Sequence, residues 1–352
     1  MEFFSLKQRT FGLDISDLSV KYLMLKKERK SFSIVSFGEF DVEEGIIESG
    51  EIKEEEKLAN LIQEHTKNLK TKYVVASLPE EKAFLKIIQM PILSNEDLKS
   101  ALLFEVENYI PLPVSEVYLD GEILSGSSKM SNKMDVLFVA VPKKIVDSYL
   151  RVLNKAKLKC VALEVESLAI VRALIQSAHQ GQSFLIVDLG ATRTSLIIVK
   201  QPSFYFTTSI PISGKLFTEL IAKNLKIEVK EAERLKLKYG LKGFLQRENP
   251  QDKMAEKIFD SLIPILSDLV QRIKLYLEYY QSHAIDDEKR DIDKVILSGG
   301  GANMIGLKEF LEVQIKKQVE IGNSLFDIGK LNNFPKEKAV SFTTAIGLAK
   351  RQ

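Results

Sequence analysis

The chain has 352 residues, of which 45% are hydrophobic and 28% charged, a composition typical of a globular protein with one or two domains. Its formal net charge of +2 gives no reason to expect a nucleic acid or an anionic membrane as partner, and no run of about 18 apolar residues predicts a membrane span. The single cysteine excludes an intramolecular disulfide, and the three scattered histidines argue against a zinc site. The N-terminus has no secretory pattern, so we expect a cytoplasmic protein.

The first predicted element is a hairpin over residues 11–25, with the sequence Phe-Gly-Leu-Asp-Ile-Ser-Asp-Leu-Ser-Val-Lys-Tyr-Leu-Met-Leu. A short apolar strand leads to Asp14 and small polar residues, and a second apolar strand follows them. A third strand at 31–37, a helix that ends near Leu69 and a strand at 73–77 come next.

Residues 83–158 depart from a simple alternation of strands and helices. The order predicted there is strand, helix, two strands, helix and strand, which indicates a small inserted α/β unit. Its first helix begins at Ser94 and stops before Pro111 and Pro113. The residues at this stop have two interpretations, a helix end with a packed tyrosine or the apolar lip of a peptide groove formed by Tyr109, Ile110 and Leu112.

A second hairpin, predicted over residues 184–200, repeats the layout of the first around Asp188-Leu189-Gly190-Ala191-Thr192. A tight turn of small residues can direct several backbone N–H groups to one point and so bind an anion. An aspartate in that turn would repel phosphate unless a cation lay between them, which indicates Mg²⁺ held through water. The alternative is a core hairpin with a capped turn. Asp14 and Asp188 lie about half the chain length apart, which predicts two related halves.

Three features of the second half complete this pattern. A helix opens at Ser213-Gly214, and in the next helix Glu233 and Lys236 share a face, as the partners of a surface ion pair would. A strand at 295–298 runs into three glycines at 299–301, which would let the backbone approach a flat ligand such as a purine. We also predict a long amphipathic helix over 261–284, with Pro264 in its first turn, and a last helix over 339–350.

Two Asp-bearing hairpins and a strand that ends in three glycines, in this order, resemble the actin-like ATPase superfamily. Within it the chain is most similar to the FtsA/PilM group, and in particular to the PilM family of type IV pilus assembly. That likeness rests on Ser77-Leu78-Pro79, on Ala-Leu-Leu-Phe-Glu-Val-Glu-Asn-Tyr-Ile-Pro-Leu-Pro at 101–113 and on Glu-Val-Glu-Ser-Leu-Ala at 164–169. It covers nearly the whole chain, and the pattern from Glu105 to Pro113 is its most family-specific part.

The resemblance implies an α/β, actin-like (ribonuclease H-like) fold with two domains, duplicated halves and an inserted small α/β subdomain of the FtsA/PilM type. The first half, subdomain 1A, would comprise residues 1–82 and 159–180. The inserted subdomain, 1C, would comprise residues 83–158. The second half would comprise residues 181–352, with subdomain 2A and, at about 213–260, subdomain 2B.

The resemblance also implies ATP and Mg²⁺ as cofactors. Asp14 and Asp188 would hold Mg²⁺ through water, and Glu166 would orient the attacking water, the alternative for Glu166 being a surface glutamate at a helix start. The implied nucleotide-binding residues are Ser16, Ser19, Lys21, Gly190, Ala191, Thr192, Thr194, Gly214, Glu233, Lys236, Gly299, Gly300, Gly301 and Asn303.

Two departures from the superfamily pattern lower the expected activity. The first loop usually reads Asp-x-Gly, whereas this chain has Ser16 at the third position, and relatives commonly show a glycine pair where this chain has Ser213-Gly214. We therefore expect nucleotide binding with at most slow hydrolysis.

Three functions from different classes fit these observations. The first is an ATP-binding scaffold of the type IV pilus inner-membrane platform, which binds the cytoplasmic N-terminal tail of PilN and closes its domains in response to nucleotide. It would lie at the inner face of the cytoplasmic membrane through its partners, and pilus motor ATPases and self-association are further candidate interactions. The second is an FtsA-like division scaffold, whose C-terminal amphipathic anchor we do not expect here. The third is a small-molecule kinase, for which no general base is identified.

Overall fold

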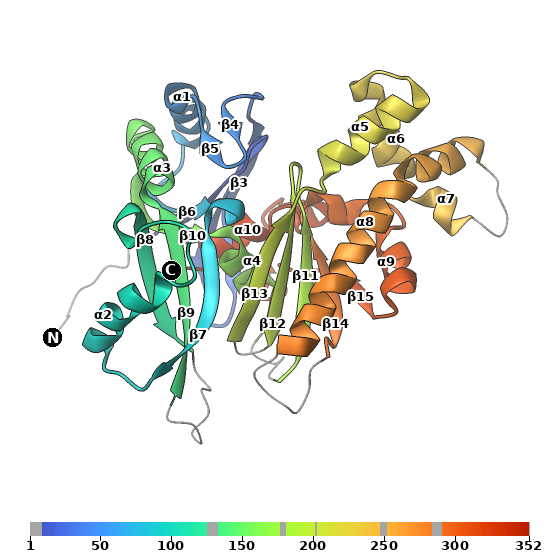
Figure 1. Ribbon diagram of the computed structural model, residues 1–352. Coiled ribbons are helices and arrows are strands. Elements are labelled where there is room, and N and C mark those ends of the chain that lie inside the picture. Colours follow the sequence, from blue (N-terminus) through green and yellow to red (C-terminus); the bar gives the residue numbers. More distant parts are fainter. Residues whose placement is uncertain are drawn as a thin grey trace. The chain divides into compact units, whose positions relative to one another are not determined.

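A six-stranded β-sheet organises the first part of the chain (Figure 1). The computed structural model describes residues 9–124, 133–176, 181–200, 203–246, 252–283 and 291–351. These residues divide into two units. The first contains those within Met1–Ala178, Pro202–Phe206 and Ser324–Gln352, and the second contains those within His179–Gln201 and Thr207–Asn323.

The helices and strands around the six-stranded sheet and its attached smaller sheets are β1 (Phe11–Ile15), β2 (Ser19–Lys27), β3 (Phe32–Asp41), β4 (Ile47–Glu48), β5 (Glu51–Ile52), α1 (Glu55–Thr66), β6 (Tyr73–Leu78), η1 (Glu80–Lys82), β7 (Phe84–Pro91), α2 (Asn95–Val106), η2 (Val114–Glu116), β8 (Val117–Ile123), β9 (Lys133–Pro142), α3 (Lys143–Lys155), β10 (Lys159–Val165), α4 (Glu166–Leu174), β16 (Ile328–Lys330), η5 (Lys336–Lys338) and α10 (Thr343–Ala349).

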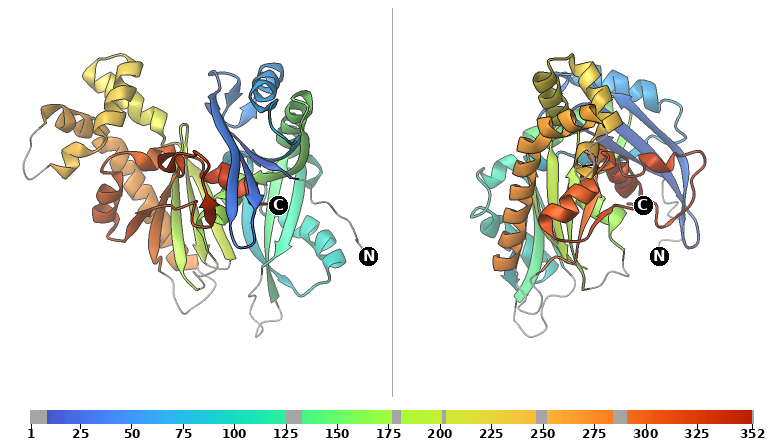
Figure 2. Two further views of the ribbon diagram at one scale, coloured as in Figure 1. Left: turned by 180° about the vertical axis from the view of Figure 1, so that it is seen from behind. Right: turned by 90° about the vertical axis from the view of Figure 1, so that its right-hand side faces the viewer.

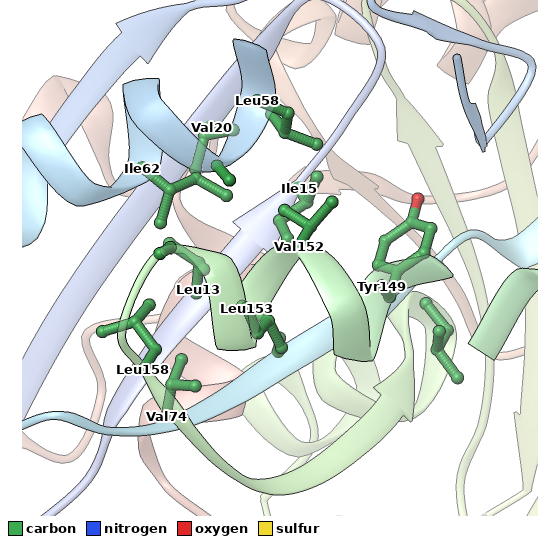
Figure 3. Close-up of a cluster of buried hydrophobic side chains, with 14 of the residues drawn as sticks. Leu13, Ile15, Val20, Leu58, Ile62, Val74, Tyr149, Val152, Leu153 and Leu158 are labelled. Atoms are coloured by element: carbon green, nitrogen blue, oxygen red, sulfur yellow. The ribbon is translucent and has the colours of Figure 1, made fainter. Parts of the chain in front are cut away.

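The strand order of the six-stranded sheet is β10-β6-β1-β2-β3-β16, and both of its faces are covered. Successive residues of a strand point to opposite faces, so Met24 packs in one core cluster while Leu23 and Leu25 pack in another. The first cluster lies under α1 and α3 and includes Leu13, Leu58 and Val152 (Figure 3). The second lies under α10. A sheet buried on both faces explains why its central strands read as almost continuous apolar runs.

A three-stranded antiparallel sheet, β7-β9-β8, lies within the same unit. With α2 it forms a separate hydrophobic cluster, which includes Leu102, Val136 and Phe138. The predicted order of strand, helix and two strands is therefore confirmed. Helix α3 follows β9 directly but contributes Val146, Tyr149 and Val152 to the core of the six-stranded sheet.

The second unit is built on a five-stranded sheet in the order β13-β12-β11-β14-β15. Helix α8 runs along one face of it (Figure 2), where the Tyr280 and Ser183 hydroxyls lie 3.2 Å apart. The elements are β11 (Ser183–Leu189), β12 (Thr194–Lys200), β13 (Ser203–Ile210), α5 (Gly214–Leu225), α6 (Val229–Tyr239), α7 (Lys242–Leu245), α8 (Lys253–His283), β14 (Lys294–Ser298), η4 (Gly300–Asn303), α9 (Leu307–Ile315) and β15 (Val319–Ile321).

Both predicted hairpins are confirmed, but the helix expected over 261–284 is wrong at its start. Helix α8 begins at Lys253, where the Asp252 carboxylate accepts hydrogen bonds from the Met254 and Ala255 amides, at 2.9 and 3.3 Å. Pro264 therefore lies in the helix interior instead of its first turn, and residue 284 is outside the described part. Burial of the apolar positions of α8 offsets the backbone hydrogen bond that proline cannot donate.

The last helix also differs from its prediction. It is shorter, from Thr343 to Ala349, and it packs on β1, β2 and α4 of the first unit instead of extending the second half. Two glycines permit this close packing: a Cβ on Gly12 would lie 2.4 Å from the Ala345 carbonyl, and one on Gly347 would lie 1.9 Å from the Ala169 carbonyl. Among the described residues, none of the helices combines the length and apolar composition that crossing a membrane requires.

Candidate functional site

Three polar residues of the first unit follow or end parallel strands at one edge of the six-stranded sheet. Strands β10, β6 and β1 are parallel neighbours, with Leu13 opposite Ala76 and Val165 opposite Leu78. Asp14, Ser77 and Glu166 therefore come at the carboxyl edge, the side on which ligands usually bind in such sheets.

Asp14 is a buried carboxylate, with 8% of the residue exposed. The Ser77 hydroxyl donates to its Oδ1 at 3.3 Å, and the Ile15 amide donates to the Ser77 hydroxyl at 2.8 Å. Burial raises the pKa of Asp14 above its usual range, although Lys21, directly opposite on β2, acts in the other direction. Lys21 and Ser77 therefore offset the burial of this carboxylate only in part.

The other polar groups of the first hairpin bond one another. The Lys21 ammonium donates to the Ser19 hydroxyl at 2.8 Å and pairs with Glu39 at 3.4 Å. The Ser16 amide and hydroxyl both donate to the Ser19 carbonyl, at 3.0 and 2.8 Å. Ser16 thus bonds back across the turn to Ser19, and the Lys21 ammonium is the cationic group opposite Asp14.

Glu166 is the first residue of α4 and faces η1. The Glu80 carboxylate accepts a hydrogen bond from the Ser167 amide at 3.2 Å, and the Glu166 carboxylate accepts a long one from the Glu80 amide at 3.5 Å. The Glu80 side chain therefore caps the start of α4, while the Glu166 side chain bonds the backbone of η1. Both alternatives for Glu166 remain predictions.

In the second unit, the turn of the second hairpin lies against the N-terminus of α5. The Gly190 amide closes the turn on the Arg193 carbonyl at 2.9 Å, and the Gly190 and Ala191 carbonyls accept hydrogen bonds from the Gly214 and Lys215 amides, each at 3.0 Å. These bonds and the Ser213 cap already use the first N–H groups of α5, so the partial positive charge of the helix N-terminus is what this junction offers to an anion.

Lys236 adds a full positive charge beside the same junction. Its ammonium donates to the Gly214 carbonyl at 2.9 Å and to the Thr218 hydroxyl at 2.8 Å, and it pairs with Glu233 at 2.7 Å. The Thr218 hydroxyl also donates to Glu233. The side chain of Lys236 is 12% exposed and that of Glu233 is 44% exposed, so the pair is buried on the lysine side only.

The glycine turn of residues 299–301 packs on Leu189, the last residue of β11. Gly299 has φ +79°, and a Cβ on it would lie 2.5 Å from the Leu189 carbonyl, while a Cβ on Gly301 would lie 1.8 Å from the Leu189 Cδ2. Gly300 opens η4, and the exposed Asn303 ends it. Asp188 is opposite Ser298 on the neighbouring strand, and the buried Ser298 hydroxyl has no hydrogen-bond partner among the described residues.

Two threonines of the second hairpin lie in different surroundings. Thr194 is fully buried, and its hydroxyl donates to the Ile212 carbonyl at 2.6 Å, so it joins the hairpin to the segment before α5. Thr192 is half-buried in the turn, and its hydroxyl accepts a hydrogen bond from Arg193. Of the two, Thr192 is the residue placed to contact a ligand.

The expected groove residues follow α2 in the first unit. Tyr109 is 39% exposed, with the Lys86 ammonium 4.1 Å from its ring centroid. Ile110 is only 7% exposed and belongs to the core of the three-stranded sheet, against which the half-buried Leu112 also packs. Tyr109 therefore offers the accessible apolar surface of this segment, and Ile110 supports it from below.

Sequence reasoning did not assign roles to Ser77, Ser213 or Glu80. Ser77 holds Asp14, Ser213 caps α5 by accepting a hydrogen bond from the Leu216 amide at 3.2 Å, and Glu80 caps α4. A small polar residue at the end of a buried strand, as in Ala76-Ser77, is a signal that could have identified the first. The pairing of Glu80 with α4 joins positions far apart in the chain, and no local pattern predicts it.

Comparison with known proteins gives consistent matches across the chain. The family model described as type IV pilus assembly protein PilM matches residues 12–352. Cell division protein FtsA of Streptococcus pneumoniae serotype 2 (strain D39 / NCTC 7466) is 23% identical over 359 residues, which cover 90% of this chain and 77% of that protein.

Solved structures match as well. A PilM-PilN type IV pilus biogenesis complex has a chain that is 25% identical, with a TM-score of 0.83 over 97% of this chain and 98% of that one. MreB5 of Spiroplasma citri bound to ADP is 14% identical, with a TM-score of 0.58 over 97% of this chain and 95% of that one. These matches confirm the expected α/β, actin-like fold.

Proposed function

The chain belongs to the family of type IV pilus assembly protein PilM, and from this membership we propose that it is an ATP-binding scaffold of the pilus assembly platform. In this proposal the protein binds the cytoplasmic N-terminal tail of PilN and responds to Mg-ATP, with hydrolysis slow at most. It would associate peripherally with the inner face of the cytoplasmic membrane through that partner.

The observation that carries the proposal is the convergence of nucleotide-binding features within the second unit. The hairpin turn at Gly190, the N-terminus of α5 and the Lys236 ammonium are joined by direct hydrogen bonds. The glycine turn of residues 299–301 packs on Leu189, next to the same hairpin turn. An anion site bordered by a glycine turn suits a ligand with phosphates at one end and a flat base at the other.

Each unit, taken by itself, contains groups whose chemistry suits Mg-ATP. Asp14 and Asp188 are the carboxylates suited to hold Mg²⁺ through water, and the burial of Asp14 favours a nearby cation. When bound, Mg²⁺ would neutralise phosphate charge. Ser16, Ser19, Lys21 and the turn of residues 190–192 would contact phosphates. Glu233, Lys236, residues 299–301 and Asn303 would contact the ribose and base.

The proposed partner follows from the matched complex, in which PilM is bound to PilN. We place the corresponding groove at Tyr109 and Leu112, where the three-stranded sheet presents partly exposed apolar side chains. An extended peptide would bind there by apolar contacts and backbone hydrogen bonds. ATP binding would alter the closure of the two units and, through it, this groove.

Calorimetry with Mg-ATP tests the nucleotide site. Asp188→Ala should weaken Mg-ATP binding by about 100-fold, equivalent to ~2.8 kcal/mol, because it removes a carboxylate that we propose holds Mg²⁺ through water. The matched control is Asp268→Ala, which removes a partly exposed aspartate of α8 that pairs with Arg272 in the same unit. Normal Mg-ATP affinity in Asp188→Ala would show that the site is wrongly assigned.

A further inference from the structure

The short hairpin β4–β5 of the first unit has a buried turn. Strands β4 and β5 pair antiparallel, and their connecting residues Ser49 and Gly50 both have positive φ, 48° and 74°. Such two-residue turns normally project into solvent, and glycine is favoured in them for its conformation alone. Here Gly50 is buried, which indicates that the turn is held by other parts of the unit.

Both polar groups of Gly50 are bonded to buried side chains from different elements. Its amide donates to the Asp17 carboxylate at 2.9 Å, and its carbonyl accepts a hydrogen bond from the Tyr149 hydroxyl at 3.2 Å. A Cβ at this position would lie 2.6 Å from the Cβ of Pro79, so no larger residue fits. One residue therefore joins the turn of the first hairpin to α3.

The two ends of this connection lie in the regions that the proposed function uses. Asp17 follows Ser16 in the turn that we assign to phosphate. Tyr149 belongs to α3, which begins directly after β9 of the three-stranded sheet. Ion pairs also connect α3 to neighbouring elements: Glu51 of β5 lies 3.8 Å from the exposed Lys144, and Glu55 of α1 pairs with Arg151 at 2.7 Å.

Tyr149 can hold Gly50 in position, but it does not change its own charge. Its ring is fully buried beside Val152 and Ile15, and its hydroxyl points out of this apolar cluster (Figure 3). Burial, together with the nearby carboxylates of Glu166, Asp17 and Asp14, keeps the pKa of Tyr149 well above its usual range. The hydroxyl therefore stays protonated and remains a donor to Gly50 throughout the physiological pH range.

We propose that Asp17, Gly50 and Tyr149 form a positioning relay that couples nucleotide binding at the turn of residues 14–19 to α3 and the three-stranded sheet. This inference rests on the proposed function, since it names the route by which nucleotide reaches the partner groove. A nucleotide that fixes the turn fixes Asp17, and the two buried hydrogen bonds of Gly50 transmit that position to α3. Tyr149 itself contacts no nucleotide.

Hydrogen exchange of the full-length protein, with and without saturating Mg-ATP, tests the relay. In the wild type, Mg-ATP should slow exchange in residues 14–19, in the β4–β5 hairpin and in α3, the last by about fivefold, the low end of usual coupling strengths. In Tyr149→Phe, the slowing should persist in residues 14–19 but fall below about twofold in α3, because the ring remains and only the hydroxyl is lost.

Two further variants separate the relay from general destabilisation. Tyr280→Phe also removes a buried tyrosine hydroxyl with a hydrogen-bond partner, but in the second unit, and its α3 response should equal that of the wild type. Asp17→Ala should abolish the response of both the hairpin and α3, whereas Asp17→Asn, which keeps the accepting oxygen, should restore it.

The outcomes distinguish this relay from the proposed function. If α3 responds to Mg-ATP equally in the wild type and in Tyr149→Phe, the relay is wrong while the nucleotide site stands. The same holds if the wild type shows slowing in residues 14–19 but none in α3. If the wild type shows no response anywhere and binds no Mg-ATP, the proposed function fails, and the relay fails with it.

Discussion

At the scale of single residues, the burial of Asp14 has a cost in stability that its proposed role in holding Mg²⁺ would explain. Its carboxylate is buried, and the single hydroxyl of Ser77 and the ammonium of Lys21 do not compensate fully, so its pKa is raised. Folded proteins tolerate such groups where a ligand needs them.

Replacing this carboxylate should stabilise the ligand-free protein. Because the pKa of Asp14 is higher in the folded state than its usual 3.8, the wild type loses stability as pH rises from that value through the raised pKa. Asp14→Asn keeps an acceptor for Ser77 but cannot ionise, and its Tm should exceed that of the wild type by on the order of 2 °C at neutral pH.

Thermal unfolding as a function of pH measures this effect. The difference in Tm should vanish at low pH, where Asp14 is protonated in both states, and the exposed-site control Asp268→Asn should show none of it. Mg-ATP should bind Asp14→Asn more weakly. A variant that is less stable than the wild type at neutral pH would contradict the account of Asp14.

The candidate residues whose place in the fold sequence reasoning predicted best are those that a local pattern fixes. Local apolar runs predict the strand ends at or next to which Asp14, Asp188, Gly190 and Gly299 lie. Thr194 looked like a phosphate contact because it is a threonine in the turn, yet its side chain is buried against Ile212. The direction of a side chain at a hairpin end depends on register and on the segment packed against it, which the local sequence does not specify.

At the scale of elements, the segment after α2 contains one residue that supports the core and another that presents an accessible surface. Ile110 completes the core of the three-stranded sheet, so a charge there would disrupt that core and would say little about binding. Tyr109 is the better probe, because its side chain is exposed. The Lys86 ammonium lies over its ring, which also packs near the buried ring of Phe138.

A pair of matched tyrosines tests the proposed groove. Tyr109→Ala should weaken binding of a synthetic PilN N-terminal peptide by about tenfold, or ~1.4 kcal/mol, because an apolar ring is lost from the contact surface. Tyr118→Ala serves as control, since Tyr118 is also exposed on this sheet and has a cationic neighbour, Lys143. Fluorescence titration that gives equal losses in the two variants would place the groove elsewhere.

Element boundaries were predicted less well than element types. The strands and most helices follow from apolar periodicity, but the proline at 264 suggested a helix start that the structure places at Lys253. A proline penalises a helix interior without forbidding it, and the long apolar face of α8 outweighs that penalty. Such a balance between local preference and tertiary burial is not readable from a short window of sequence.

At the scale of the whole molecule, the C-terminal segment belongs to the first unit. Arg172 of α4 pairs with Glu164 and donates to the Gly347 carbonyl at 3.1 Å, and Arg351 pairs with the same glutamate at 3.3 Å. Lys350 pairs with Asp327 at 2.7 Å. The contacts of Arg172 with Gly347 and of Arg351 with Glu164 join positions more than a hundred residues apart, so the sequence could predict the helix but not the unit to which it belongs.

The central claim is that this member of the PilM family binds Mg-ATP and that nucleotide and PilN tail influence each other. The direct measurement is calorimetric titration of the purified protein with Mg-ATP, with and without a saturating synthetic PilN N-terminal peptide. We predict that ATP binds and that the peptide changes its affinity by about fivefold or more, with ATP changing the peptide affinity by the same factor. Mg-ATP binding that is undetectable, or unaffected by a peptide that does bind, would contradict the account.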